Sequence, residues 1–336
     1  MASSEVLPYR GYGAWGSLWN AAPARIIRLM SAIYRALIEP LLEQVRRLPR
    51  RPDGPAAPVG VGLALGGGFA RGFAHLGVLQ VLEQNHVPIS CIAGTSVGSI
   101  LGAAYAGGVP LARIVAVCRS LHFRDFGRLH LSRLGLASND RLGDLIRSTF
   151  VALTFEDLLI PMAIVATDLG NGEPYVFTKG DLVDATRASC AFPGLFEPVM
   201  INGRCLADGG LVAPVPTRAA KELGAARVLG VSVGFNNWNG SAPTNMFQVV
   251  SRAVSAAQKH QTESWARHAD ILLEPDVQDL DWDDFGRVDE AISAGAAAAR
   301  EILPQLRELL RLPGIPQRHA APRRAHGMNL ARGPAR

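Results

Sequence analysis

The stretch VGVGLALGGGFARGFAHLGVLQVLEQ, residues 59–84, contains the strongest fold signal in the sequence. It begins with an apolar run, 59–65, that is typical of a strand buried on both faces of a sheet. Three glycines follow, and residues 69–84 then have the spacing of a helix. A second pair comes directly after it, with a strand predicted at 88–94 and a small-residue helix at 97–107. This order predicts an α/β fold.

The alternation of strand-like and helix-like segments continues to about residue 316. We therefore expect a largely parallel sheet covered by helices on both faces. The 336 residues, 48% of them hydrophobic, provide enough apolar side chains for such a core and exclude wholesale disorder. The further strands are predicted at 162–168, at 173–178, before Asp208 and at 227–233, and the further helices at 214–223, 244–268 and 288–311.

The segments that flank this block differ from it in composition. Residues 1–58 hold half of the Tyr and Trp residues, an apolar stripe at helical spacing from Arg25 to Arg47, and a Pro-rich linker. Residues 317–336 contain five Arg and no acidic residue, and we expect them to be disordered. Three parts are predicted: an N-terminal amphipathic helical extension with its linker (1–58), an α/β domain (59–316) and a basic tail (317–336).

The net charge of +5 is unevenly distributed along the chain. Residues 1–58 carry eight Arg and four acidic residues, hence +4, and residues 317–336 carry +5, so residues 59–316 must carry −4. The positive charge therefore belongs to the two ends, which argues against a nucleic-acid partner and favours an anionic membrane surface. Residues 9–47 are either a peripheral membrane anchor or a surface that packs on the protein itself or on a second subunit. The oligomeric state stays open.

The cysteines and the absence of targeting patterns predict a cytoplasmic protein. Cys91, Cys118, Cys190 and Cys205 lack the short spacing of a metal or redox pair, so we expect four reduced thiols. The first residues lack the basic and apolar pattern of a secretory signal. No stretch has the roughly 20 uncharged apolar residues of a transmembrane helix. Peripheral association with the inner membrane is the alternative expectation.

The motif Gly94-Thr95-Ser96-Val97-Gly98 lies between a predicted strand and a predicted helix. In a G-x-S-x-G turn of this kind the serine occupies a sharp bend with its hydroxyl exposed. The glycines tolerate strained backbone angles, and the helix N-terminus favours developing negative charge. The motif is weak in a glycine-rich chain, but its context makes Ser96 a candidate nucleophile.

The run Gly66-Gly67-Gly68 and the nearby Arg71 are candidates for an oxyanion-binding loop. Glycine amides can approach a developing oxyanion without obstruction, and an Arg adds positive charge. A dinucleotide-binding loop would need a third Gly at position 71, and no acidic residue ends the second strand near position 90. The Gly-Lys-Ser/Thr of a Walker loop is also missing, so nucleotide binding is disfavoured.

Asp208, followed by Gly209 and Gly210, is the candidate base for Ser96. Burial beside an apolar substrate would raise its pKa and make it a more effective base. The competing Asp168 is interpreted as a residue that caps a turn. His260 and His268 are interpreted as solvated helix positions, and His75 as a packed or capping residue. An α/β-hydrolase triad is disfavoured, because only about one strand precedes Ser96.

These motifs, together with Ser189-Cys190-Ala191-Phe192-Pro193-Gly194, make the chain resemble the patatin-like phospholipase family. The similarity is to its bacterial branch related to neuropathy target esterase, and it covers roughly residues 59–311. It implies a patatin-like three-layer α/β/α fold with a mainly parallel central sheet. The N-terminal extension and the basic tail lie outside the resemblance.

The resemblance also implies an activity, the hydrolysis of acyl esters in phospholipids or lysophospholipids by a Ser–Asp dyad without metal or cofactor. The nucleophile falls on Ser96, the base on Asp208, and the oxyanion loop on Gly66, Gly67, Gly68 and Arg71. The motif glycines are Gly94, Gly98, Gly209 and Gly210. Two alternatives stay open: a non-phospholipid esterase or thioesterase, and a catalytically silent, membrane-associated regulatory module.

Overall fold

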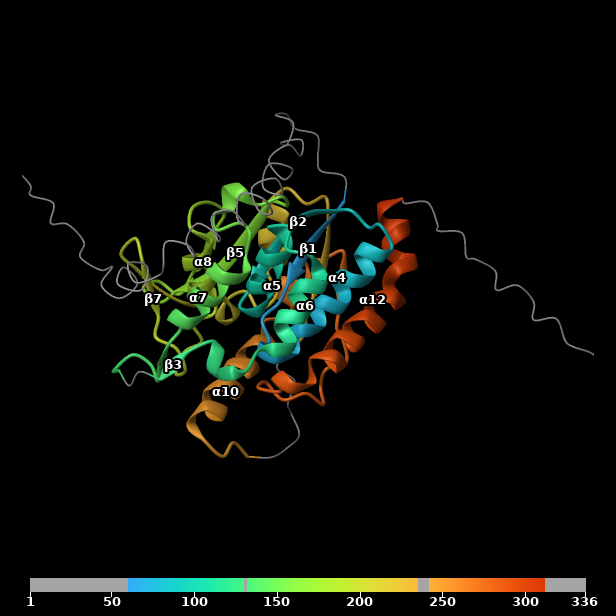
Figure 1. The fold of residues 1–336 in the computed structure, drawn as a ribbon. Coiled ribbons are helices and arrows are strands. Elements are labelled where there is room, and N and C mark those ends of the chain that lie inside the picture. The colour runs from blue at the N-terminus through green and yellow to red at the C-terminus, as the bar shows by residue number, and fades with distance from the viewer. Residues whose placement is uncertain (1–59, 130–131, 235–241, 312–336) are drawn as a thin grey trace, which may run out of the picture. The chain divides into compact units, whose positions relative to one another are not determined.

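The computed structural model describes residues 60–129, 132–234 and 242–311 (Figure 1). The predicted N-terminal extension and basic tail lie outside these residues. Within them, no helix is both long enough and apolar enough to cross a membrane. None of the four cysteines forms a disulfide bond, and Cys91, Cys118 and Cys190 are buried.

The centre of the domain is a mixed, mostly parallel sheet. Its parallel part follows the order β10-β9-β1-β2-β5, so the predicted α/β architecture is confirmed for these strands. β1 is buried along its whole length, as the apolar run in the sequence predicted. The strands of this part are β1 (Val61–Leu65), β2 (Ile89–Thr95), β5 (Met162–Asp168), β9 (Arg227–Val231) and β10 (Ile271–Leu273).

The sheet also has an antiparallel part, which the sequence pattern does not predict. β6 (Pro174–Phe177) and β8 (Arg204–Asp208) both pair antiparallel with β5, and β7 (Val199–Ile201) pairs antiparallel with β8. Short connections join β5 to β6 and β7 to β8, and such connections permit antiparallel neighbours without a crossover helix. A two-stranded sheet, β3 (Arg128–Leu129) with β4 (Ala137–Ser138), is separate.

Helices cover both faces of the sheet, and alternate residues of the strands contact different helices. Leu63 and Leu65 belong to the large core shared with α4, α5 and α12, whereas Ala64 packs in a smaller core with α9. Four of the predicted helices are confirmed as α4 (Ala74–Gln84, after a 3-10 turn at Phe69–Phe73), α5 (Val97–Ala106), α9 (Thr217–Glu222) and α12 (Val288–Leu310). The single helix predicted over 244–268 is instead two helices, α10 (Met246–His260) and α11 (Thr262–Ala266), which meet at Gln261.

Three further helices were not predicted: α6 (Leu111–Ser120), α7 (Asp140–Thr149) and α8 (Leu182–Ser189). They lie between the strands β2 and β8 in the sequence and carry side chains of the large core or of the neighbouring small cluster around Leu142. α8 begins at Asp181, whose side chain accepts a hydrogen bond from the Asp184 amide.

The helices α4 and α12 lie side by side (Figure 1). They approach each other closely at two glycines. A Cβ atom on Gly77 would lie 1.9 Å from the Ile292 carbonyl oxygen, and one on Gly295 would lie 1.9 Å from the Ala74 carbonyl oxygen. Because both obstacles are backbone atoms, this close approach requires glycine at both positions.

Candidate active site

Ser96 occupies the sharp turn between β2 and α5 that the G-x-S-x-G motif predicted. Its backbone angles, φ 52° and ψ −125°, lie in a region that residues other than glycine rarely adopt. Gly98 allows the turn to lie against β1, because a Cβ atom there would be 2.2 Å from the Leu65 carbonyl oxygen. Ser96 is 8% exposed, so the turn presents the side chain toward the interior of a pocket.

Asp208 reaches Ser96 because β2 and β8 meet on the same edge of β5. Thr95, the last residue of β2, is opposite Val165, and Asp208, the last residue of β8, is opposite Ala166. β6 pairs with the same two residues of β5, so it occupies the other edge. The parallel β2 and the antiparallel β8 therefore approach from opposite directions, and their ends meet beside Ser96.

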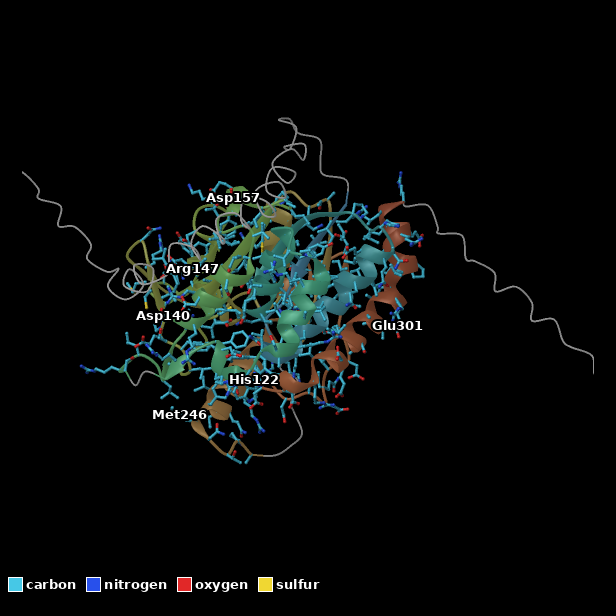
Figure 2. The ribbon with its side chains drawn as sticks, in the orientation of Figure 1. His122, Asp140, Arg147, Asp157, Met246 and Glu301 are labelled. Carbon is cyan, nitrogen blue, oxygen red and sulfur yellow. The ribbon has the colours of Figure 1, made fainter. Side chains whose placement is uncertain are left out.

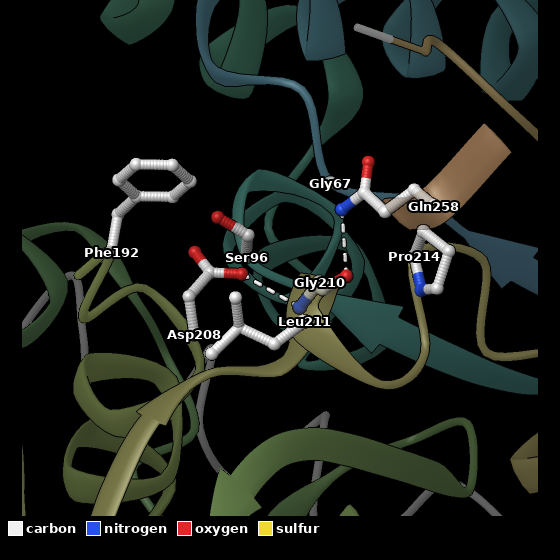
Figure 3. Close-up of a pocket in the computed structure, with 8 residues that line it drawn as sticks. All are labelled: Gly67, Ser96, Phe192, Asp208, Gly210, Leu211, Pro214 and Gln258. Atoms are coloured by element: carbon white, nitrogen blue, oxygen red, sulfur yellow. Dashed lines mark hydrogen bonds between the residues drawn. The ribbon is translucent and has the colours of Figure 1, made fainter. Parts of the chain in front are cut away.

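The Asp208 carboxyl is buried and lies beside the Ser96 side chain (Figure 3). Burial raises its pKa to about 6, and hydrogen bonds from Ser96 and from the Gly210 amide oppose that rise. The Gly210 amide donates to Oδ1 over 2.7 Å. The turn is tight, since a Cβ atom on Gly209 would lie 2.1 Å from the Val165 carbonyl oxygen.

Ser189 supports the Ser96 turn, a role that the sequence analysis did not assign. The Ser96 amide donates to Ser189 Oγ over 2.9 Å, and that hydroxyl donates to the Val165 carbonyl oxygen over 2.6 Å. The Ser99 hydroxyl donates to the Ser96 carbonyl oxygen over 2.6 Å. The signal for this role in the sequence is that Ser189 opens the motif 189–194, which contributes to the family resemblance.

The glycine loop lies against Ser96, but two of its amides are already hydrogen-bonded. Gly66 donates to the Val231 carbonyl oxygen and Gly67 to the Pro214 carbonyl oxygen, both over 3.0 Å. Among the residues that the structure describes, the Gly68 amide has no backbone acceptor. Of the three glycines predicted for the oxyanion loop, Gly68 is therefore the one whose amide is not committed to the sheet or to the Pro214 loop.

His75 holds this loop from the inside of the domain. The ring is fully buried, and its Nε2 lies 2.8 Å from the Gly66 carbonyl oxygen. Burial lowers the pKa of His75 to about 4, so the imidazole is neutral and donates its Nε2 proton to that carbonyl. This agrees with the packed or capping position that the sequence suggested.

Arg71, predicted as part of the oxyanion loop, instead binds backbone carbonyl groups. Its Nε donates to the Leu280 oxygen over 2.7 Å and its Nη1 to the Gly234 oxygen over 2.9 Å. Only 2% of the residue is exposed, and burial lowers its pKa, an effect that Asp281 and Asp284 oppose. In this structure Arg71 tethers the segment around residues 280–285.

The competing candidates have structural partners away from Ser96. Asp168 Oδ1 accepts the Gly170 amide and Oδ2 pairs with Arg204, and these bonds lower the pKa of its carboxyl. His260 ends α10, and His268 lies after α11, where the Arg267 guanidinium donates to its ring. None of the three lines the pocket that holds Ser96 and Asp208.

α10 covers one side of this pocket. Gln258, 9% exposed, donates to the Gly210 carbonyl oxygen over 2.6 Å and lines the pocket with Ser96, Asp208 and Gly67 (Figure 3). At the other end of the helix, Phe247 packs in the cluster around Phe192, while Met246 stays 64% exposed at the surface (Figure 2).

The fold and the site together define a mixed α/β protein with a serine on a strained strand-to-helix turn beside a buried aspartate. Residues 63–221 match the family model described as patatin-like phospholipase. This part of the chain belongs to the patatin-like phospholipase family, and the chain has homologues in the NTE family.

An uncharacterized NTE family protein of Mycobacterium tuberculosis is 38% identical over 176 residues, which are 52% of this chain and 49% of that protein. Lysophospholipase NTE1 of Kluyveromyces lactis is 27% identical over 309 residues, which are 83% of this chain and 21% of that enzyme. The chain thus spans at most about half the length of these relatives. Among solved structures, VipD from Legionella pneumophila is similar over 78% of this chain and 73% of that chain, with a TM-score of 0.46 and 12% identity.

Proposed function

We propose that the protein is a serine lipid acyl hydrolase that cleaves carboxylic esters of phospholipids or lysophospholipids through an acyl-enzyme. The observation that carries the proposal is the pairing of Ser96 with Asp208, a buried carboxyl whose pKa is raised to about 6. A carboxylate with that pKa is ionised at neutral pH and is a better base than an exposed one. The relationship to fungal lysophospholipases supports a lipid ester as the substrate.

In this mechanism Asp208 accepts the hydroxyl proton of Ser96 as the serine oxygen attacks the ester carbonyl carbon. The tetrahedral intermediate collapses, the alcohol leaves with the proton from Asp208, and the acyl group stays on Ser96. Water then gives a proton to Asp208, attacks the acyl-enzyme and releases the carboxylic acid. Asp208 returns the proton to Ser96, which restores the dyad.

The proposed oxyanion donor is the Gly68 amide. The N-terminus of α5 adds the Val97 amide, which also has no backbone acceptor among the described residues. Amides fixed in this way stabilise charge that develops in the transition state and need no reorganisation. The loop is positioned by the amide hydrogen bonds of Gly66 and Gly67 and by the His75 contact. Arg71 anchors the loop to the segment around residues 280–285.

The test compares wild type with Ser96→Ala for hydrolysis of a lysophospholipid and for labelling by a fluorophosphonate probe. We expect the variant to lose both, with a fall in turnover of up to about 10⁶-fold, as for a lost serine nucleophile in a protease. Ser90→Ala is the matched control, because Ser90 lies on β2, the strand that leads to Ser96, and its buried hydroxyl has no partner among the described residues. Retained hydrolysis by pure Ser96→Ala protein would contradict the proposal.

A panel of substrates separates the proposal from its alternatives. Activity on thioesters or simple esters without activity on any phospholipid or lysophospholipid would favour a different hydrolase. A wild-type protein that takes no fluorophosphonate label and hydrolyses none of these substrates would favour a regulatory module.

A further inference from the structure

An apolar cavity begins at Ser96. Its wall contains Ser96 and six phenylalanines. Phe69, Phe123 and Phe285 belong to a network of ring contacts that also includes Trp282, with centroid distances of 5.3 to 6.3 Å. Among the described lining residues no side chain is charged. A ligand in this cavity must therefore be apolar, because a buried charge would have no partner there.

A second apolar cavity lies beside the first, between α5, α6 and α7. Its wall includes Ala104, Leu121 and Phe150, and again no described lining residue is charged. The two cavities share four lining residues: Phe73, Val97, Ile100 and Phe126.

These four residues form a partition between the two cavities. Val97, Ile100 and Phe126 are only partly buried, whereas Phe73 is buried. Side chains with free space on both sides lose few packing contacts when they change rotamer, so the partition can open without rearrangement of the helices. Ser96 also lines the small pocket that holds Asp208, Gly67 and Gln258, which offers polar groups to the rest of a substrate.

We propose that the two cavities are successive compartments of one acyl-chain site and that the partition of Phe73, Val97, Ile100 and Phe126 sets the acyl-chain length. This inference rests on the proposed function. A short acyl chain attached to Ser96 ends in the first compartment. A long chain displaces the partition and buries its terminal methylenes in the second compartment, where each buried methylene adds to binding.

The test is the ratio of kcat/KM for p-nitrophenyl palmitate to that for p-nitrophenyl butyrate. Ala104→Leu fills the second compartment, since Ala104 is 2% exposed and lines only that cavity. We expect the ratio to fall by at least about tenfold, the scale on which a hydrophobic pocket discriminates chain length, with butyrate unaffected. Ala116→Leu, the same change at an exposed position of α6, is the control and should leave the ratio unchanged.

Thr149→Trp provides a second variant in case Ala104→Leu does not fold, because Thr149 is only partly buried at the end of α7. It should lower the ratio in the same direction. Ile100→Ala should widen the partition and raise the ratio. A wild-type ratio in folded Ala104→Leu and Thr149→Trp proteins would overturn the proposal.

A binding measurement distinguishes failure of the acyl site from failure of the proposed function. Ser96→Ala protein should bind a fluorescent fatty acid that palmitate displaces. Adding Ala104→Leu should weaken the affinity for palmitate at least about tenfold and leave the affinity for butyrate unchanged. This readout needs no catalysis. If palmitate displaces the probe equally well from Ser96→Ala protein with and without Ala104→Leu, the second compartment is rejected even if the enzyme hydrolyses esters.

Discussion

Two residues that border the same apolar cavity, Phe69 and Ser96, have a positive φ of 51° and 52°. Such conformations cost about 1–3 kcal/mol each and persist only where surrounding structure fixes them. For Ser96 the fixing contacts are the bonds with Ser189 and Ser99 on either side of the residue. In the proposed mechanism Ser96 is therefore held by its backbone, and Asp208 needs only to accept its proton.

The pKa of Asp208 predicts the pH dependence of activity. Because the base must be ionised and burial raises its pKa to about 6, kcat/KM should be constant above that pH. Below it, activity should fall about tenfold for each pH unit as the carboxylate becomes protonated. A rate profile from pH 4.5 to 8 with a soluble ester measures this. A profile that is flat to pH 4.5 would contradict the assignment of Asp208 as base.

Gln258 is predicted to act as a positioning residue for Asp208. Its amide holds the Gly210 carbonyl, and the Gly210 amide in turn lowers the pKa of Asp208. Gln258→Ala should loosen that turn, lower kcat about tenfold and move the acidic limb of the rate profile to higher pH. The exposed Gln261→Ala is the control. A drop in kcat with an unmoved acidic limb would indicate a purely structural role.

At the scale of elements, most of the sheet and the motif-bearing turns could be predicted from the sequence. The strand at 162–168 has the predicted bounds. The bounds of the strand and the helix on either side of Ser96 differ from the predicted ones by about one residue. α6, α7 and α8 were missed although α7 has Leu142, Leu145 and Ile146 at helical spacing, a signal that was available.

Other features depend on contacts between distant residues and could not be predicted from local pattern. The antiparallel direction of β8 is set by its pairing with β5, and the acceptor of the Gly66 amide, Val231, comes from β9. A sequence motif identifies three glycine amides, but only the assembled sheet decides which of them stays uncommitted.

The close approach of α4 and α12 predicts a strong stability effect at Gly77. Gly77→Ala improves helix propensity, but its Cβ would lie 1.9 Å from the Ile292 carbonyl oxygen. The helices must separate, so the free energy of unfolding should fall by about 1–3 kcal/mol. Gly286→Ala is the matched control, since no described atom lies within 4 Å of its new Cβ. Urea unfolding of both variants measures the difference, and equal midpoints would contradict the prediction.

At the scale of the whole molecule, the uneven charge predicts binding to anionic membranes. The chain ends carry +4 and +5 while residues 59–316 carry −4. Each Arg near an anionic surface adds about 1 kcal/mol of attraction, which salt screens. In vesicle flotation the full chain should bind anionic vesicles more strongly than neutral ones, and high salt should weaken this binding.

A chain shortened to residues 59–336 tests the contribution of the N-terminal segment. It should bind anionic vesicles more weakly than the full chain, because it lacks four net positive charges and the aromatic residues of the extension. Equal binding of the two chains would remove the anchor interpretation of residues 9–47.

Consecutive residues of one buried strand, Val165 and Ala166, set the spacing between Ser96 and Asp208. Surface connections such as 169–173 contribute nothing to that spacing. Insertions there are free to accumulate during evolution, and a designer can add residues to them. One residue added inside β5 would instead shift the base against the nucleophile by one strand rise, about 3.3 Å, and turn the following side chains to the opposite face. Tolerance to changes in length should therefore be high at these connections and absent in β5.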